Sequence, residues 1–144
     1  MGDLSKLYPA TWTGWPPAMP YGDRLVWSAF LAAHGHEWSD YAYDVELDRS
    51  GPGVEHDDPA MRKMWTRLIA KRVDVVALRA AGATLIEVRT RAAWQSVGQL
   101  IGYRELWPRD YPGVPLEGAI IVTNEIDPAI RSVAEGQQLR VLVV

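Results

Sequence analysis

The sequence predicts a single α/β domain with a mixed sheet and flanking helices, preceded by an extended N-terminal arm. Its 144 residues suit one domain. After residue 21, helical and strand periodicities alternate, and the last third reads strand, helix, strand, which is typical of a parallel crossover. Residues 1–21 instead hold four prolines and no periodic pattern. We therefore expect an arm over residues 1–21 and a domain over residues 22–144.

The first half of the domain opens with a helix and a strand. Apolar residues at helical spacing predict a helix over residues 23–33, with Gly35 at its C-terminal cap. The positions expected to face the core are Leu25, Val26, Ala29, Phe30 and Ala33. Residues 41–48 alternate in polarity, which predicts a half-buried strand. Its apolar face would carry Tyr41, Tyr43, Val45 and Leu47, and its polar face Ala42, Asp44, Glu46 and Asp48.

The remaining elements are predicted from glycine and proline residues that interrupt regular structure, and from residues that cap helices. A Gly/Pro-rich loop over residues 49–58 precedes Asp58-Pro59, which is typical of a helix start and predicts a short helix near 59–69. Two β-rich runs, 72–78 and 84–89, predict a hairpin with its turn at 80–83. The rest of the chain predicts a helix over 92–106, a strand over 118–123, a helix from Asp127-Pro128 to Gly136 and a strand over 139–144.

Composition excludes several classes of protein. The chain has no cysteine, so disulfides and thiolate chemistry are excluded and a reducing compartment is expected. Neither a signal-peptide pattern nor an apolar run long enough for a spanning helix is present, so we expect a protein that is not secreted and has no membrane partner. The net charge of −3 conceals an acidic stretch, 37–58, followed by a stretch, 62–109, with ten Lys or Arg and three acidic residues. The basic residues could follow a phosphate backbone, although charge alone favours an ordinary solvated helix face.

Two carboxylates and an arginine are expected to meet on one face of the hairpin. Side chains alternate along a strand, so a hairpin centred between residues 81 and 82 places Asp74 opposite Arg89 and residue 76 opposite Glu87. Two carboxylates on adjacent strands can bind a hard divalent cation. The alternative is a cross-strand ion pair between Asp74 and Arg89.

The order of elements, with Val73-Asp74-Val75, Ile86-Glu87-Val88-Arg89 and a helix bearing Gln99 and Tyr103, resembles the PD-(D/E)XK nuclease family. The resemblance implies a restriction-endonuclease-like fold over residues 22–144, Asp74 and Glu87 as ligands of Mg²⁺ or Mn²⁺, and Gln99 as a supporting residue. It also implies an acidic ligand that the family often takes from its first helix. The candidates are Asp23 at the helix start, Glu37 after its end and Glu46 on the next strand, and we favour Glu46 over Glu37. The chain departs from the family at Arg89, where the family has lysine, and a planar guanidinium that stays protonated does not replace an ammonium group.

Two functions are compatible with these residues. In the first, the chain is a Mg²⁺-dependent DNA endonuclease or exonuclease with Asp74, Glu87, Arg89 and Gln99 as its catalytic set. Its DNA contacts would be Arg62, Lys63, Arg67, Lys71, Arg72 and Tyr103. In the second, favoured because the family's lysine is missing, the chain is a non-catalytic structural or assembly protein. The pattern is similar to small proteins encoded by tailed phages, which implies a connector or tail-associated role, in the virion or the host cytoplasm.

The assembly hypothesis assigns a role to the arm. Trp and Tyr are frequent where proteins meet partners, and the arm carries four of them. We expect Tyr8, Trp12, Trp15 and Tyr21 to contact either the arm's own domain or neighbouring subunits.

Overall fold

The computed structural model describes residues 4–47, 59 and 71–144, so the expected loop over 49–58 and helix near 59–69 lie outside the described residues, apart from Pro59. The described elements are α1 (Tyr21–His34), a short 3₁₀ turn (Gly35–Glu37), β1 (Asp40–Leu47), β2 (Lys71–Arg79), β3 (Gly82–Ala92), α3 (Trp94–Asp110), β4 (Leu116–Ile126), α4 (Pro128–Gly136) and β5 (Leu139–Val143). No helix among these residues is long and apolar enough to cross a membrane.

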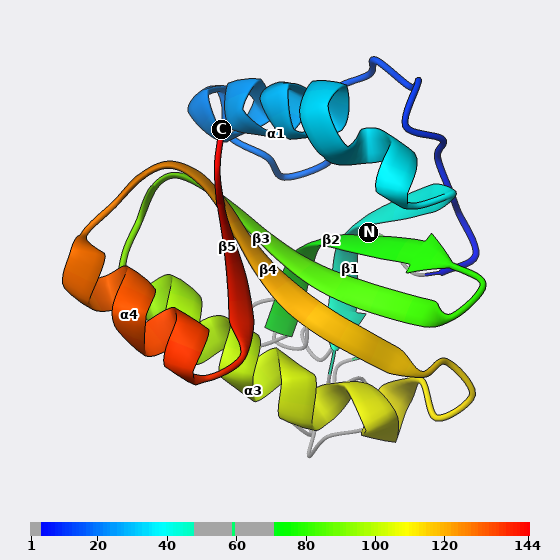
Figure 1. Ribbon diagram of the computed structural model, residues 1–144. Helices are drawn as coiled ribbons and strands as arrows, with labels where there is room; N and C mark the ends of the chain where they lie inside the picture. The colour runs from blue at the N-terminus through cyan, green and yellow to red at the C-terminus, as the bar shows by residue number, and fades with distance from the viewer. Residues whose placement is uncertain (1–3, 48–58, 60–70) are drawn as a thin grey trace.

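The five strands form one mixed sheet in the order β1-β2-β3-β4-β5. β1, β2 and β3 are antiparallel neighbours, whereas β3, β4 and β5 run parallel. The two parallel connections are made by α3 and α4, which lie on one face of the sheet, while α1 covers the other face (Figure 1). The expected α/β class, mixed sheet and flanking helices are confirmed.

Two hydrophobic clusters fill the space on either side of the sheet. One joins Val97, Leu100 and Trp107 of α3 to the sheet and to α4. The other joins Val26, Trp27 and Phe30 of α1 to the opposite face. The predicted core face of the first helix is therefore partly wrong, because Leu25 is 50% exposed and Trp27, which was not expected there, is 2% exposed.

The β2–β3 hairpin is tighter than the sequence suggests. The turn consists of Ala80 and Ala81, and Val75 pairs with Ile86. The predicted register, which placed Asp74 opposite Arg89, is therefore wrong by two residues. Gly82 has a φ of +146°, and a Cβ at this position would lie 2.2 Å from the carbonyl oxygen of Pro115. Any other residue would both strain the backbone and collide with the loop before β4, so glycine sets where the strand begins.

Asp44 reverses the side-chain alternation of β1. Its φ of +52° is left-handed, a conformation that Asp tolerates better than most residues. Before it, Tyr41 and Tyr43 contact the cluster under α1, and after it Val45 and Leu47 contact the cluster under α3. The prediction that these four residues share one face is therefore wrong.

The arm before α1 packs against its own domain. Tyr8 and Tyr41 exchange two backbone hydrogen bonds, each 2.8 Å long, at the outer edge of β1. The Tyr8 ring stacks on Trp12 at 4.2 Å between ring centroids, and both rings contact Tyr43. The structure thus shows the arm in contact with its own domain, which is one of the two environments expected for it.

Candidate functional site

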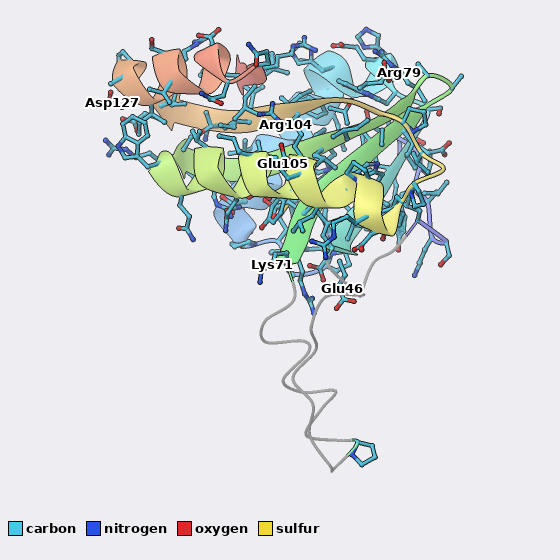
Figure 2. The ribbon with its side chains drawn as sticks, turned by 90° about the horizontal axis from the view of Figure 1, so that it is seen from below. Glu46, Lys71, Arg79, Arg104, Glu105 and Asp127 are labelled. Atoms are coloured by element: carbon cyan, nitrogen blue, oxygen red, sulfur yellow. The ribbon has the colours of Figure 1, made fainter. Side chains whose placement is uncertain are left out.

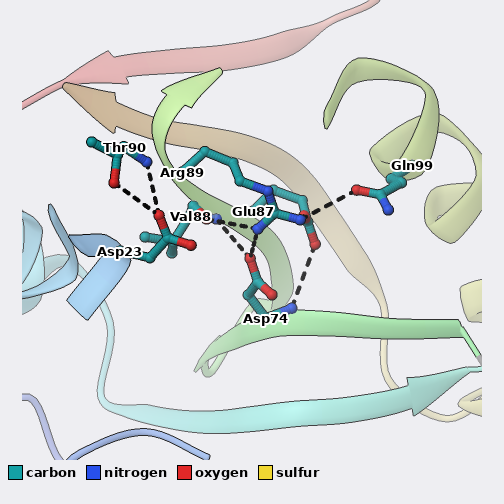
Figure 3. A network of polar contacts seen from close by, with 7 residues as sticks. All are labelled: Asp23, Asp74, Glu87, Val88, Arg89, Thr90 and Gln99. Carbon is teal, nitrogen blue, oxygen red and sulfur yellow. Dashed lines mark hydrogen bonds and ion pairs between the residues drawn. The ribbon is translucent and has the colours of Figure 1, made fainter. Parts of the chain in front are cut away.

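The carboxylate pair lies where β2 and β3 separate. Backbone pairing of the two strands ends at Val75 and Ile86, while β2 continues beside β1 and β3 continues beside β4. Asp74 and Glu87 come next on each strand and bridge the opening with their side chains. Asp74 Oδ2 accepts a hydrogen bond of 2.9 Å from the backbone N–H of Val88, and Glu87 Oε1 lies 3.5 Å from the backbone nitrogen of Asp74 (Figure 3).

Arg89 lies between the two carboxylates. Its Nη1 donates to Asp74 Oδ2 over 2.7 Å, and its Nη2 is 3.0 Å from Glu87 Oε2. The second contact is an ion pair without hydrogen-bond alignment, because Glu87 Oε2 has no hydrogen-bond partner among the described residues. The predicted clustering of Asp74, Glu87 and Arg89 is found. The guanidinium takes the central position that a shared cation would need.

The two carboxyl groups of this cluster differ in burial, and burial affects the pKa of each. The side chain of Glu87 is 1% exposed, against 30% for Asp74 and 34% for Arg89. The pKa of Glu87 is raised to about 8, chiefly by burial and then by the charge of Asp74, with Arg89 opposing both. Burial also raises the pKa of Asp74, although Arg89 and the Val88 N–H counteract part of this effect. The pKa of Glu87 is therefore raised mainly because its carboxyl is the more deeply buried of the two, whereas Asp74 accepts the hydrogen bond from Arg89.

Helix α3 brings Gln99, which the resemblance assigned to the site, and Tyr103, which was predicted to contact DNA, close to the cluster. Gln99 Oε1 lies 3.5 Å from Arg89 Nη2, at the long limit of a hydrogen bond. Tyr103 is 7% exposed and close enough to the carboxylates for their charge to act on its hydroxyl. Its pKa is raised to about 12, first by burial and then by Glu87 and Asp74. Its buried position does not suit the predicted role as a surface contact for DNA.

Asp23, at the start of α1, is a buried acid that contacts β3 close to the cluster. Its carboxylate accepts hydrogen bonds from the backbone N–H of Thr90, at 2.8 Å, and from the Thr90 hydroxyl, at 3.1 Å (Figure 3). This ties the start of α1 to β3 directly after Arg89, and the charge of Asp23 acts on Asp74.

Glu46 does not join Asp74 and Glu87. It lies with Lys71 at the end of the β1–β2 pair opposite Arg79 (Figure 2), and its carboxylate is 3.5 Å from Arg72. Within residues 4–47 and 71–144, no group of three His, Cys, Asp or Glu residues is arranged to hold a metal ion. Glu46 therefore lies apart from the Asp74–Glu87 pair, and the Arg89 guanidinium contacts both carboxyl groups of that pair.

The expected DNA-contact residues are only partly described. Arg62, Lys63 and Arg67 lie outside the described residues. Arg72 pairs with Asp44 at 2.8 Å as well as with Glu46, so its charge is compensated within the domain. Lys71 is exposed at the start of β2.

The four aromatic residues of the arm separate into two pairs. Tyr8 and Trp12 are half-buried against Tyr43, whereas Trp15 is 51% exposed and Tyr21 is 61% exposed. The exposed rings contact each other at 5.7 Å, and the Arg24 guanidinium lies over Trp15 at 4.8 Å.

No protein-family model, curated protein or solved structure matches the chain.

Proposed function

We propose that the chain is a non-catalytic protein with a nuclease-like fold, acting as a structural or assembly component of a phage particle. The observation that carries this proposal is the position of Arg89, which contacts both Asp74 and Glu87. A fixed internal cation compensates the carboxylate pair, so these residues stabilise the junction of β2 and β3. The phage setting comes from the resemblance to small tailed-phage proteins.

The exposed aromatic residues support the assembly role. Trp15 and Tyr21 keep half or more of their surface accessible although each has an aromatic neighbour. Large amphipathic rings beside an arginine are the residue types that contribute most to protein interfaces. We assign the interface to Trp15 and Tyr21, because the rings of Tyr8 and Trp12 already pack against Tyr43.

A DNA-cleavage assay tests the non-catalytic assignment. Purified protein is incubated with supercoiled and linear DNA in Mg²⁺ or Mn²⁺, with Asp74→Ala as the control for contaminating nuclease. We expect no difference between the two proteins. Cleavage by the native chain that disappears in Asp74→Ala contradicts the proposal.

Sedimentation over a range of concentrations tests the assembly role. Self-association of the native chain should weaken in Trp15→Ser and Tyr21→Ser, and remain in Trp94→Ser, which alters an exposed ring on α3. Equal behaviour of all three variants in sedimentation, and in reconstitution with the neighbouring virion proteins, contradicts the assigned interface.

The second candidate, a Mg²⁺-dependent nuclease, is favoured by one observation. Arg89 is 34% exposed and could swing away, which would leave the two carboxylates facing each other across the opening. Activity would then require Glu87 to lose its proton, so cleavage should rise as the pH passes through about 8. Arg89→Lys, which supplies the residue type of the family, should raise cleavage under this hypothesis and leave it absent under ours.

A further inference from the structure

We infer that a pocket between the arm and α1 binds an apolar side chain of a partner protein that has a carboxylate beside it. This inference deepens the proposed assembly role and rests on it, because it specifies the chemistry of the partner at the arm.

The pocket has a mixed lining, in which aromatic and aliphatic side chains stand beside Thr11, Thr13 and Ser28. It encloses about 320 Å³ between residues 10–16 of the arm and residues 24–32 of α1, with Trp12, Trp27, Leu31 and Tyr43 among its lining residues. This volume is within the range of sites that receive a small group. The indole N–H of Trp27 already donates to the Tyr43 hydroxyl over 3.1 Å, so that donor needs no further partner. An apolar side chain matches the aromatic part of this lining, and the threonine and serine hydroxyls suit the polar backbone of the segment that carries it.

The walls of the pocket are held in place. Trp12 is stacked on Tyr8, and Gly14 lies so close to the Trp12 indole that a Cβ there would be 2.1 Å from it. The arm therefore passes tightly around this ring, and the Tyr8–Tyr41 hydrogen bonds fix the arm to β1. A preformed pocket loses less conformational entropy on binding than one that must assemble.

Arg24 determines the charge of the occupant. It lines the pocket, stacks on Trp15 and reaches the Thr13 carbonyl oxygen at 3.5 Å. In the part of the chain that the structure describes, no carboxylate lies within ion-pair distance of Arg24. A carboxylate on the partner would supply the missing counter-charge.

The exposed surface beside the pocket favours a protein segment over a free small molecule. From Arg24 the surface continues across Trp15 to Tyr21 and Leu25, whose side chains are 51%, 61% and 50% exposed. A peptide segment can cover this surface and fill the pocket together, whereas a small molecule would fill the pocket alone.

Blocked pentapeptides test the inference by NMR titration of the full-length protein. Three peptides carry, respectively, phenylalanine between two aspartates, phenylalanine between two lysines, and alanine between two aspartates. We expect the aspartate–phenylalanine peptide to shift the amide signals of residues 10–16 and 24–32, with about threefold to fivefold tighter binding than the lysine peptide. The alanine peptide should cause no shifts. Absence of shifts with every peptide, or equal binding of the two phenylalanine peptides, overturns the inference.

Variants assign the effect to the pocket. Arg24→Gln should remove the preference for aspartate while binding of the lysine peptide stays. Ala32→Phe, which places a ring in the pocket, should abolish binding, whereas Ala33→Phe, on the next exposed residue of α1 and outside the pocket lining, should not. Tighter binding of free 3-phenylpropionate than of the peptide would overturn the assignment to a protein partner. These results are independent of the DNA-cleavage and sedimentation experiments, so failure of the pocket and failure of the proposed function are distinguishable.

Discussion

Arg89 donates a 2.7 Å hydrogen bond to the carboxylate of Asp74 on the neighbouring strand, at the point where the backbone pairing of β2 and β3 ends. The same carboxylate oxygen accepts the Val88 N–H, so one side chain joins the two strands twice. These contacts take the place of backbone hydrogen bonds where the two strands separate. They therefore hold β2 and β3 together at this point.

Removal of the Arg89 charge should destabilise the fold. In Arg89→Gln, Asp74 loses its ion-pair partner, and Glu87 loses its 3.0 Å contact with the guanidinium. We expect the free energy of unfolding to fall by about 1–3 kcal/mol, below the full cost of a deeply buried pair because Asp74 and Arg89 are partly exposed. Urea denaturation measures the loss. Arg91→Gln, at an exposed position two residues along β3, serves as the control and should cost little. Equal losses in the two variants would contradict the role of Arg89.

Glu87 should make the protein less stable as the pH rises. Its pKa is about 8 in the folded protein, against an ordinary value of 4.5, so between these values the folded state binds more protons than the unfolded state. The contribution is complete below pH 4.5 and is lost as the pH rises through about 8, with a slope of at most about 1.4 kcal/mol per pH unit.

Glu87→Gln isolates this effect, because glutamine keeps the shape and does not titrate. Denaturation of both proteins at pH 5, 6, 7 and 8 should show the stability of the native chain falling relative to the variant. A constant difference between the two proteins across this range would show that Glu87 ionises at its ordinary pKa.

Asp23 should stabilise the contact between α1 and β3. Asp23→Ala leaves the Thr90 N–H without its acceptor, and we expect a loss of about 1–3 kcal/mol in thermal or chemical unfolding. Thr90→Val removes only the 3.1 Å hydroxyl bond and should cost less, about 0.5–1.5 kcal/mol. A double variant no less stable than Asp23→Ala would confirm that both changes act on one contact, and strictly additive losses would argue against it.

The left-handed backbone at Asp44 predicts an order of tolerance to substitution. All three replacements lose the charge that pairs with Arg72, although Asn keeps an acceptor oxygen. Asn accepts a φ of +52°, Ala does so less well, and β-branched Val least. We therefore expect stability to decrease from Asp44→Asn to Asp44→Ala to Asp44→Val, with about 1–2 kcal/mol between the extremes. The melting temperatures of the three variants test the order. Equal melting temperatures for Asp44→Val and Asp44→Asn would show that the left-handed backbone at this position does not destabilise a β-branched residue.

The cluster at the β2–β3 junction could be predicted although the hairpin register was wrong. The register differs by two residues, and because side chains alternate with a period of two, the predicted face is preserved. Asp74, Glu87 and Arg89 therefore meet even though Asp74 is not opposite Arg89 in the ladder. A one-residue error would have removed the site.

Other features depend on information that local patterns do not carry. The alternation rule fails in β1 because one residue, Asp44, has a positive φ. The role of Asp23 depends on Thr90, which is 67 positions away in the sequence. Trp27 is in the core because Tyr41 and Tyr43 face α1, and that follows from the same reversal at Asp44.

The hydrogen bonds between Tyr8 and Tyr41 protect the outer edge of the sheet. An uncovered edge strand offers unpaired N–H and C=O groups to any other chain and promotes aggregation. Deletion of the first 20 residues would expose the edge of β1. The shortened chain would then be prone to aggregate through this edge, whatever its natural partners are. The arm therefore combines two opposite properties in one short segment: it occupies the backbone groups of β1 at Tyr41, and it leaves the Trp15 ring exposed.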